Sequence, residues 1–289
     1  MNALALVLVL AAACAHAGWN LASKRAGTSG VPFVWLACLG TVLLLAPFAV
    51  GAMVRLESGL LPWLVAGGVS GIIHTAYFST LQRGYAVGDI SVVYPLARGT
   101  GPMLSVVLAM IILHDRPGWL GLLGAMIIIA GVLLIALSSR GKGTQRGGSA
   151  VSGVVFGLVT GVLIAGYTLW DAHAVTTVQV YPVALMWMSS ATQAILLAPV
   201  GLRDRGRLRS IWQQHRREVA TVAVLSPVAY ILVLFAMRLA PVSMVAPVRE
   251  VSVVLVSLIG SVLFQEPAFR RRLIGAVVVL AGVTCLALS

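Results

Sequence analysis

The sequence predicts an all-helical integral membrane protein with ten transmembrane helices, arranged as two inverted repeats of five helices each. Three observations support this fold class. Of the 289 residues, 60% are hydrophobic and only 10% are charged, whereas soluble domains contain about 45–50% apolar and about 25% charged residues. The chain divides into ten apolar stretches of the length that crosses a bilayer, about 20 residues each. Finally, the two halves of the chain share short motifs at matching positions.

The ten predicted spans follow one another with only short polar breaks between them. The first apolar stretch lacks the positively charged start of a signal peptide, so we interpret it as an uncleaved transmembrane span. The spans leave no room for a soluble catalytic or DNA-binding domain. They are placed at residues 2–21, 31–54, 60–82, 89–113, 118–138, 151–170, 181–201, 218–237, 242–264 and 271–288.

An internal duplication relates the two halves. The segment VYPLARG around Pro95 recurs as VAPVREV around Pro247, and the glycine pair Gly124 and Gly131 recurs as Gly275 and Gly282. Five spans per repeat is an odd number, so the second repeat crosses the membrane in the opposite sense. Inverted repeats of this kind are typical of secondary transporters.

The duplication also predicts the domain organisation. The first repeat, spans one to five, covers residues 1–138, and the second, spans six to ten, covers residues 151–289. A linker rich in Gly, Ser and basic residues joins them at residues 139–150.

Basic residues are distributed unequally between the two faces of the membrane. Cytoplasmic loops retain an excess of Lys and Arg, so the asymmetry predicts that both termini are non-cytoplasmic in a multi-pass, bacterial-type inner (plasma) membrane. The same asymmetry accounts for the net charge of +12 without nucleic-acid binding. One side carries Lys24, Arg25, Arg83, Arg140, Lys142, Arg146, Arg203, Arg205, Arg207, Arg209, Arg216, Arg217, Arg270, Arg271 and Arg272, and the other carries Arg55, Arg116 and Arg238.

Several short motifs together resemble a known family. They are Gly18, Trp19, Asn20 and Lys24 at the end of the first span, the prolines Pro95 and Pro247, Glu266 with Pro267 after the ninth span, and the repeated glycine pairs. On these residues the two halves resemble paired EamA domains of the drug/metabolite transporter superfamily. The chain is also similar to bacterial exporters of the aromatic amino-acid/paraquat type.

This resemblance implies an alternating-access transporter with a central cavity between the repeats. Two features depart from the family pattern. Asp115 stands where the first repeat usually has Glu, and the charge asymmetry conflicts with the cytoplasmic termini of many relatives.

Three charged residues lie within predicted spans, where insertion of a charge costs at least about 2.5–3.5 kcal/mol. Arg98 and Glu250 occupy equivalent positions of the two repeats, and Arg249 precedes Glu250. We therefore expect Arg98 and Glu250 to approach each other and pair across the two halves. The pair is either a structural latch or a substrate and gating site. Nearby Pro95 and Pro247 each remove a backbone hydrogen bond and are expected to kink their helices.

Polar and aromatic side chains recur at helical spacing and predict a cavity wall. The spacing within the first and third spans places these residues on one helical face each, and lipid would not solvate such a face. For His16 and Asn20, simple hydrogen bonding to neighbouring helices is the alternative. The predicted lining residues are His16, Trp19, Asn20, His74, Tyr77, Phe78, Tyr94, Tyr167 and Tyr230.

Residues near predicted span ends are assigned to the membrane interface. Aromatic rings at this depth usually anchor a helix at the headgroups, and we assign Trp63, Trp119, Trp170 and Trp212 to this class. Asp171, at the predicted end of the sixth span, is interpreted as a solvated helix end in preference to a gate residue.

The expected function is therefore a secondary transporter that exports small organic metabolites, amino acids first. An exchanger or importer of anionic metabolites, such as a sugar nucleotide or phosphonate bound by Arg98 and Arg249, is the alternative. Proton coupling would need Glu250, His16 or His74, and uncoupled transport is equally compatible with the sequence. We expect no enzyme activity, cofactor or metal, because the sequence contains no catalytic or metal-binding motif. A monomer is compatible with the sequence.

Overall fold

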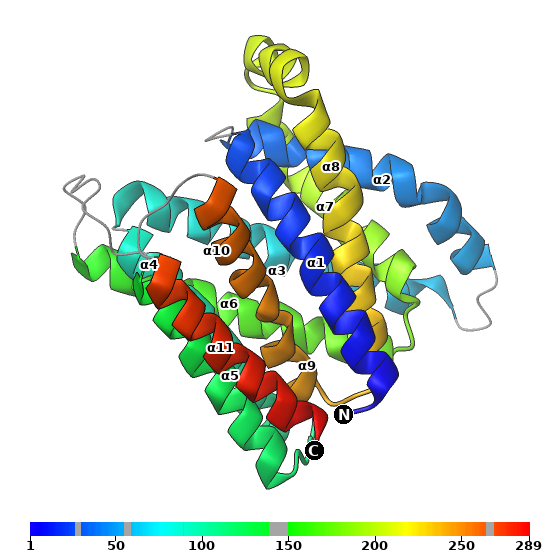
Figure 1. Ribbon diagram of the computed structural model, residues 1–289. Helices are drawn as coiled ribbons and strands as arrows, with labels where there is room; N and C mark the ends of the chain where they lie inside the picture. The colour runs from blue at the N-terminus through cyan, green and yellow to red at the C-terminus, as the bar shows by residue number, and fades with distance from the viewer. Residues whose placement is uncertain (27–29, 55–58, 89, 139–149, 264–268) are drawn as a thin grey trace.

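The computed structural model describes residues 1–26, 30–54, 59–88, 90–138, 150–263 and 269–289. All regular secondary structure in these residues is α-helical (Figure 1). The helices are α1 (Ala3–Arg25), α2 (Gly30–Val54), α3 (Leu60–Val87), α4 (Ile90–Ile112), α5 (Trp119–Ser138), α6 (Ala150–Thr176), α7 (Pro182–Gly201), α8 (Arg205–Met237), α9 (Val242–Arg249), α10 (Val251–Leu263) and α11 (Phe269–Ala287). The predicted linker lies outside the described residues, apart from its last residue, Ala150, which begins α6.

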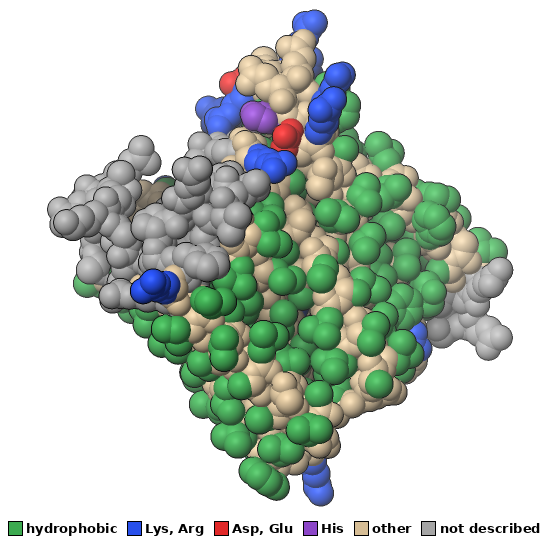
Figure 2. All heavy atoms as spheres, viewed as in Figure 1, with side chains coloured by type: hydrophobic (Ala, Val, Ile, Leu, Met, Phe, Trp, Pro, Cys, Tyr) green, Lys and Arg blue, Asp and Glu red, His purple; other side chains and the backbone are tan. Residues whose placement is uncertain are grey.

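These helices have the length and surface of membrane spans. Nine helical segments in the described part of the chain are long and apolar enough to cross a bilayer, one of them being residues 242–259 across α9 and α10, while residues 273–287 of α11 form a shorter apolar helix. Large hydrophobic side chains such as Leu43, Phe48 and Ile195 are exposed on the outside. Hydrophobic side chains cover the flanks of the molecule in Figure 2, and many Lys and Arg side chains gather at the end that carries the start of α8. The ten-span expectation agrees with this all-helical architecture.

The helices pack in pairs that a two-fold axis would exchange. The repeats match α1 with α6, α2 with α7, α3 with α8, α4 with α9 and α10 together, and α5 with α11. The packing of α1 on α8 corresponds to the packing of α6 on α3. Likewise, the packing of α4 on α6 corresponds to that of α9 and α10 on α1, and α5 packs on its own equivalent, α11. Both termini lie at the same end of the molecule, as an even number of crossings requires (Figure 1). Each contact thus has a counterpart between the equivalent helices, and such reciprocal contacts are the property of a two-fold interface.

The repeated glycine pairs explain how α5 and α11 approach each other. A Cβ on Gly124 would lie 2.7 Å from the carbonyl oxygen of Gly282, and a Cβ on Gly282 would lie 2.7 Å from the carbonyl oxygen of Gly124. Gly131 and Gly275 show the same reciprocity at 2.9 and 3.0 Å. Glycine permits this backbone-to-backbone approach because it has no side chain, as at other small-residue helix interfaces in membranes. The two contacts exchange under the repeat, so the pseudo-two-fold passes between α5 and α11.

The eighth span begins earlier than predicted. α8 starts at Arg205 rather than near residue 218, and His215 interrupts it with non-helical dihedral angles, φ −129° and ψ 23°. The side chain of Asp204 caps the helix by accepting a hydrogen bond from the Arg207 amide at 2.8 Å. This segment projects beyond the other helices at the top of Figure 1. The sequence of this segment is too polar for a membrane span, so hydropathy does not predict a helix here.

The interface assignments of two tryptophans and of Asp171 are wrong. Trp63 is only 6% exposed, and Trp170 donates its indole N–H to the Ala66 carbonyl at 2.9 Å. α6 continues to Thr176, so Trp170 and Asp171 lie inside the helix rather than at its end. Trp119 and Trp212, by contrast, are exposed, as expected for interfacial anchors.

Candidate functional site

The ninth span has a one-residue interruption of its α-helical hydrogen bonding at Glu250, where the backbone dihedral angles stay right-handed helical (φ −70°, ψ −7°). α9 ends at Arg249, Glu250 forms the cap, and α10 begins at Val251. The Glu250 amide donates to the Pro247 carbonyl at 2.9 Å, and the Val253 amide donates to the Glu250 carbonyl at 2.9 Å. In contrast, α4 continues without a break through Pro95. The two charged side chains at this point lie inside the protein: Arg249 is 6% exposed and Glu250 is 1% exposed.

Arg98, Arg249 and Glu250 form what we call the charged centre. The Arg98 Nη1 atom lies 3.5 Å from Glu250 Oε2, and the Arg249 Nε atom lies 3.8 Å from Glu250 Oε1. Both distances describe ion pairs that are too long for ordinary hydrogen bonds. Glu250 Oε2 has no hydrogen-bond partner among the described residues. One carboxylate thus lies between two guanidinium groups, and the charged centre carries one net positive charge.

Tyrosine rings flank the charged centre on two helices. The Arg98 guanidinium lies 5.7 Å from the ring centroid of Tyr94 on α4, and the Arg249 guanidinium lies 5.8 Å from the ring centroid of Tyr167 on α6. Cations within about 6 Å of an aromatic face are attracted by the ring. The rings therefore help to hold the two guanidinium groups in place.

A second group of polar side chains, the Asp171 cluster, consists of His74, Tyr167, Asp171 and Tyr230. The Tyr230 hydroxyl donates to Asp171 Oδ2 at 2.5 Å, and His74 Nε2 lies 3.1 Å from the same oxygen. His74 stacks on Tyr167 with ring centroids 4.2 Å apart. Asp171 itself is fully buried, and its Oδ1 atom has no hydrogen-bond partner in the described part of the chain.

Asp171 is the residue of this cluster that the sequence interpretation missed. It was expected to be a solvated helix end, but α6 carries it into the protein against α3 and α8. A signal was available, because Asp171 follows Tyr167 by four residues and therefore shares its helical face. The two clusters are adjacent: Tyr167 contacts His74 and also lies under Arg249.

The remaining predicted lining residues lie mainly on α1 and α3. His16 and Trp19 form an edge-to-face pair with ring centroids 4.8 Å apart. Asn20 donates to the His16 carbonyl of its own helix at 2.7 Å, and His16 Nε2 is buried with no hydrogen-bond partner among the described residues. On α3, Tyr77 contacts Tyr167 edge to face at 5.5 Å. Phe78, which follows Tyr77, is half-buried.

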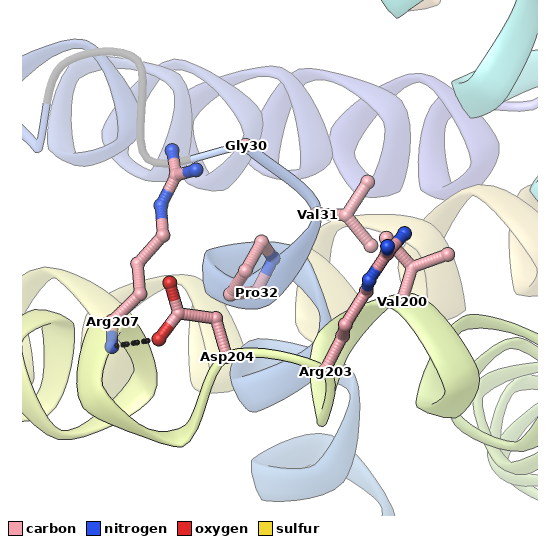
Figure 3. A pocket seen from close by; sticks show the side chains of 7 residues that line it. All are labelled: Gly30, Val31, Pro32, Val200, Arg203, Asp204 and Arg207. Atoms are coloured by element: carbon pink, nitrogen blue, oxygen red, sulfur yellow. Dashed lines mark hydrogen bonds between the residues drawn. The ribbon is translucent and has the colours of Figure 1, made fainter.

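A pocket that the sequence did not predict lies at the basic end of the molecule, close to the start of α8. It has a volume of about 530 Å³ and is lined by Gly30, Val31, Pro32, Val200, Arg203, Asp204 and Arg207 (Figure 3). It contains none of the residues of the charged centre or the Asp171 cluster. Among the described residues, no group of three or more His, Cys, Asp or Glu side chains is placed to bind a metal ion.

Comparison with known proteins agrees with this fold. The family description "EamA-like transporter family" matches twice, over residues 3–137 and 151–288. A solved structure titled only "Crystal structure of protein" superposes with a TM-score of 0.74 at 17% identity, and the alignment covers 98% of this chain and 97% of that one. No curated protein matches the chain. The two family matches together cover both repeats, and the chain therefore belongs to the EamA-like transporter family, whose members are membrane transporters of small molecules.

Proposed function

We propose that this protein exports small organic metabolites, amino acids first, by alternating access through a central cavity between the two repeats. The observation that carries the proposal is the charged centre. Arg98 belongs to the first repeat, Arg249 and Glu250 belong to the second, and the two repeats meet at the Arg98–Glu250 pair. Secondary transporters with inverted repeats bind substrate at such an interface, near the midplane and beside a discontinuous helix.

The chemistry of the charged centre fits a zwitterion. The guanidinium groups of Arg98 and Arg249 would bind a carboxylate, for which guanidinium is the best-shaped cation. Glu250 Oε2, which has no hydrogen-bond donor among the described residues, would accept from an α-ammonium group. The tyrosine rings beside both arginines offer apolar surface to the substrate side chain.

The broken ninth span favours a moving element at this site. The C-terminus of α9 and the N-terminus of α10 both lie at Glu250. Helix ends within a span are used in transporters to contact ions and substrate. In the proposed cycle the two repeats rock about the charged centre, with His16, Trp19, Asn20, Tyr77, Phe78 and Tyr94 lining the cavity. From the charge asymmetry we place both termini outside the cytoplasm.

Transport of anionic metabolites is the second candidate function. The charged centre contains two cations and one anion, so a phosphonate or a sugar nucleotide would also be attracted to Arg98 and Arg249. In that case Glu250 would act only as a structural counter-ion that the substrate displaces. The two functions therefore differ in what they require of Glu250.

Counterflow in proteoliposomes tests the proposal. Purified protein is loaded with unlabelled amino acids, and entry of labelled methionine, threonine, phenylalanine and lysine is followed. Saturable entry of any of them supports amino-acid transport. E250Q should lower that entry, compared at equal amounts of folded protein, roughly tenfold or more, because a hydrogen bond to a charged group contributes about 1.5–3 kcal/mol. The control is R238Q, since Arg238 is exposed and its side chain donates a hydrogen bond to the exposed Gln179.

Absence of entry for all four amino acids would overturn amino-acid transport. Competition and counterflow with a phosphonate would then test the second function. In that case R98Q and R249Q should abolish binding, whereas E250Q should retain or strengthen it.

A further inference from the structure

We propose that Asp171 is a proton-binding site that couples transport to proton movement, with His74 as its proton relay. This inference rests on the proposed transport function and adds its energy source. It differs from the sequence expectation, which considered Glu250, His16 and His74 but not Asp171. Four features of the site support a proton-binding role: Asp171 is buried, its two oxygens are bonded unequally, His74 is partly exposed, and Tyr167 connects the site to the charged centre.

The two carboxylate oxygens of Asp171 have different surroundings. Oδ2 accepts from the Tyr230 hydroxyl at 2.5 Å and lies 3.1 Å from His74 Nε2. Oδ1 is buried and has no hydrogen-bond partner among the described residues. A buried carboxylate oxygen without a donor is costly, and protonation of the carboxyl group lowers that cost because it removes the charge. Thr168, one turn earlier on α6, is also fully buried, and its hydroxyl has no hydrogen-bond partner in the described chain.

His74 gives Asp171 its route to the proton. The His74 side chain is 17% exposed, whereas the Asp171 side chain is 0% exposed. The imidazole ring can take up a proton at Nδ1 and donate its Nε2 proton to the carboxylate, which leaves neutral His and neutral Asp. The reverse transfer returns the proton. Histidine suits this relay because its two ring nitrogens can exchange roles near neutral pH.

The neighbouring helices contribute few other titratable or charged groups. α3 contributes His74 and Tyr77, α8 contributes Tyr230, and α6 itself contributes Tyr167. From α9 the nearest charge is Arg249, which lies over the Tyr167 ring. α4 contributes Arg98, which belongs to the charged centre and pairs with Glu250.

Tyr167 connects the proton site to the charged centre. The Tyr167 ring stacks on the His74 ring with centroids 4.2 Å apart. The Arg249 guanidinium lies 5.8 Å from the centroid of the same Tyr167 ring. A substrate that displaces Arg249 would therefore disturb the ring on which the proton relay stacks. A shared element whose position both sites bias is the physical requirement for coupling.

Glu250 is less suited to carry the proton. It lies between Arg98 and Arg249, and its neutralisation would leave two buried guanidinium groups without a counter-ion. Removal of one partner of a buried ion pair is strongly unfavourable. The Asp171 cluster, in contrast, contains one carboxylate, one imidazole and phenolic hydroxyls, so protonation there leaves no unpaired cation.

Infrared difference spectroscopy tests the proton site without any substrate. Reconstituted protein is moved between acidic and alkaline buffer, and the carbonyl stretch of protonated carboxylic acid is recorded. The wild type should show a pH-dependent band that D171N lacks. D204N is the matched control, since Asp204 is exposed and caps α8, a role that Asn retains. If D171N does not fold, Y230F should shift the band by removing a hydrogen bond to the same carboxyl group. An unchanged band in these variants, or no pH-dependent band in the wild type, overturns the proposal.

Transport then tests coupling, separately from the function itself. The measured quantity is the ratio of labelled phenylalanine or lysine entry with a pH gradient to entry without one. The gradient should stimulate the wild type and D204N, and the stimulation should be lost in D171N and H74Q. Counterflow without stimulation of the wild type would overturn coupling but leave the transport function intact. Absence of counterflow would overturn amino-acid transport, while the infrared result would still decide whether Asp171 binds a proton.

Discussion

Arg98 and Glu250 occupy equivalent positions in the two repeats and face each other across the interface, with Nη1 of Arg98 3.5 Å from Oε2 of Glu250. Equivalent residues can meet only close to the axis that relates the repeats. At such a position an unmodified duplication would juxtapose two like charges. The divergence to one cation and one anion converts this repulsion into an ion pair, and it makes the site chemically asymmetric.

The Arg98–Glu250 pair should be strongly interdependent. E250Q should destabilise the folded protein by about 3–5 kcal/mol, because it leaves two arginines without their counter-ion. R98Q should destabilise it as well, because it leaves Glu250 with only the longer contact to Arg249. E250Q should cost more, since it affects both arginines. The double variant R98Q/E250Q should recover part of the stability but not transport. Thermal unfolding in detergent measures the stabilities, with R238Q as the exposed control. Additive losses would show that the two side chains do not interact.

The contact between α5 and α11 predicts opposite effects of the same substitution at different glycines. In an open helical position Gly→Ala stabilises a helix by about 1 kcal/mol. G68A should behave in this way, because nothing lies within 4 Å of a Cβ there. G124A would place its methyl group 2.7 Å from the Gly282 carbonyl oxygen and should destabilise the protein by about 1–3 kcal/mol. Thermal unfolding of both variants checks the difference, and equal effects would contradict the close approach.

The sequence predicts the membrane architecture well, because the thickness of the bilayer fixes the length of an apolar span. It also aligns Arg98 with Glu250, since the duplication determines that correspondence without any coordinates. The first residues of α8 could not be predicted, because hydropathy, the property that identifies the spans, does not detect a polar helix. Hydropathy detects burial in lipid, and the polar first part of α8, residues 205–217, has only Ile211 buried.

The Asp171 cluster could not be predicted from single helices. His74, Asp171 and Tyr230 lie on α3, α6 and α8, and only their packing brings one carboxylate within reach of both partners. The prolines show a similar limit. Pro95 and Pro247 occupy equivalent positions, yet α4 is continuous and the ninth span is broken. The proline therefore permits a break, and the surrounding packing decides whether it forms.

Asp115 should stabilise the start of α9. Its Oδ2 atom accepts a hydrogen bond from the Ser243 amide at 2.9 Å, which ties the connection after α4 to the first turn of α9. A carboxylate at a helix N-terminus satisfies a free amide and interacts favourably with the helix dipole. D115A should therefore lower the stability by about 1 kcal/mol, and D115N should lose less. Thermal unfolding of the two variants measures this, and an equal loss would mean that the side-chain acceptor is unimportant.

The orientation of the chain can be tested at the two ends of the molecule. In a background where Cys14, Cys38 and Cys285 are replaced by Ala, single cysteines are introduced as R209C and T177C, both at exposed positions. Arg209 lies at the basic end, which the excess of Lys and Arg assigns to the cytoplasm, whereas Thr177 lies in the connection between α6 and α7 at the opposite end. A membrane-impermeant maleimide should label T177C in intact cells and R209C only after permeabilisation. The reverse pattern would place the termini in the cytoplasm, and the basic residues of α8 would then face outward against the charge asymmetry. Labelling of both variants in detergent is the control for reactivity.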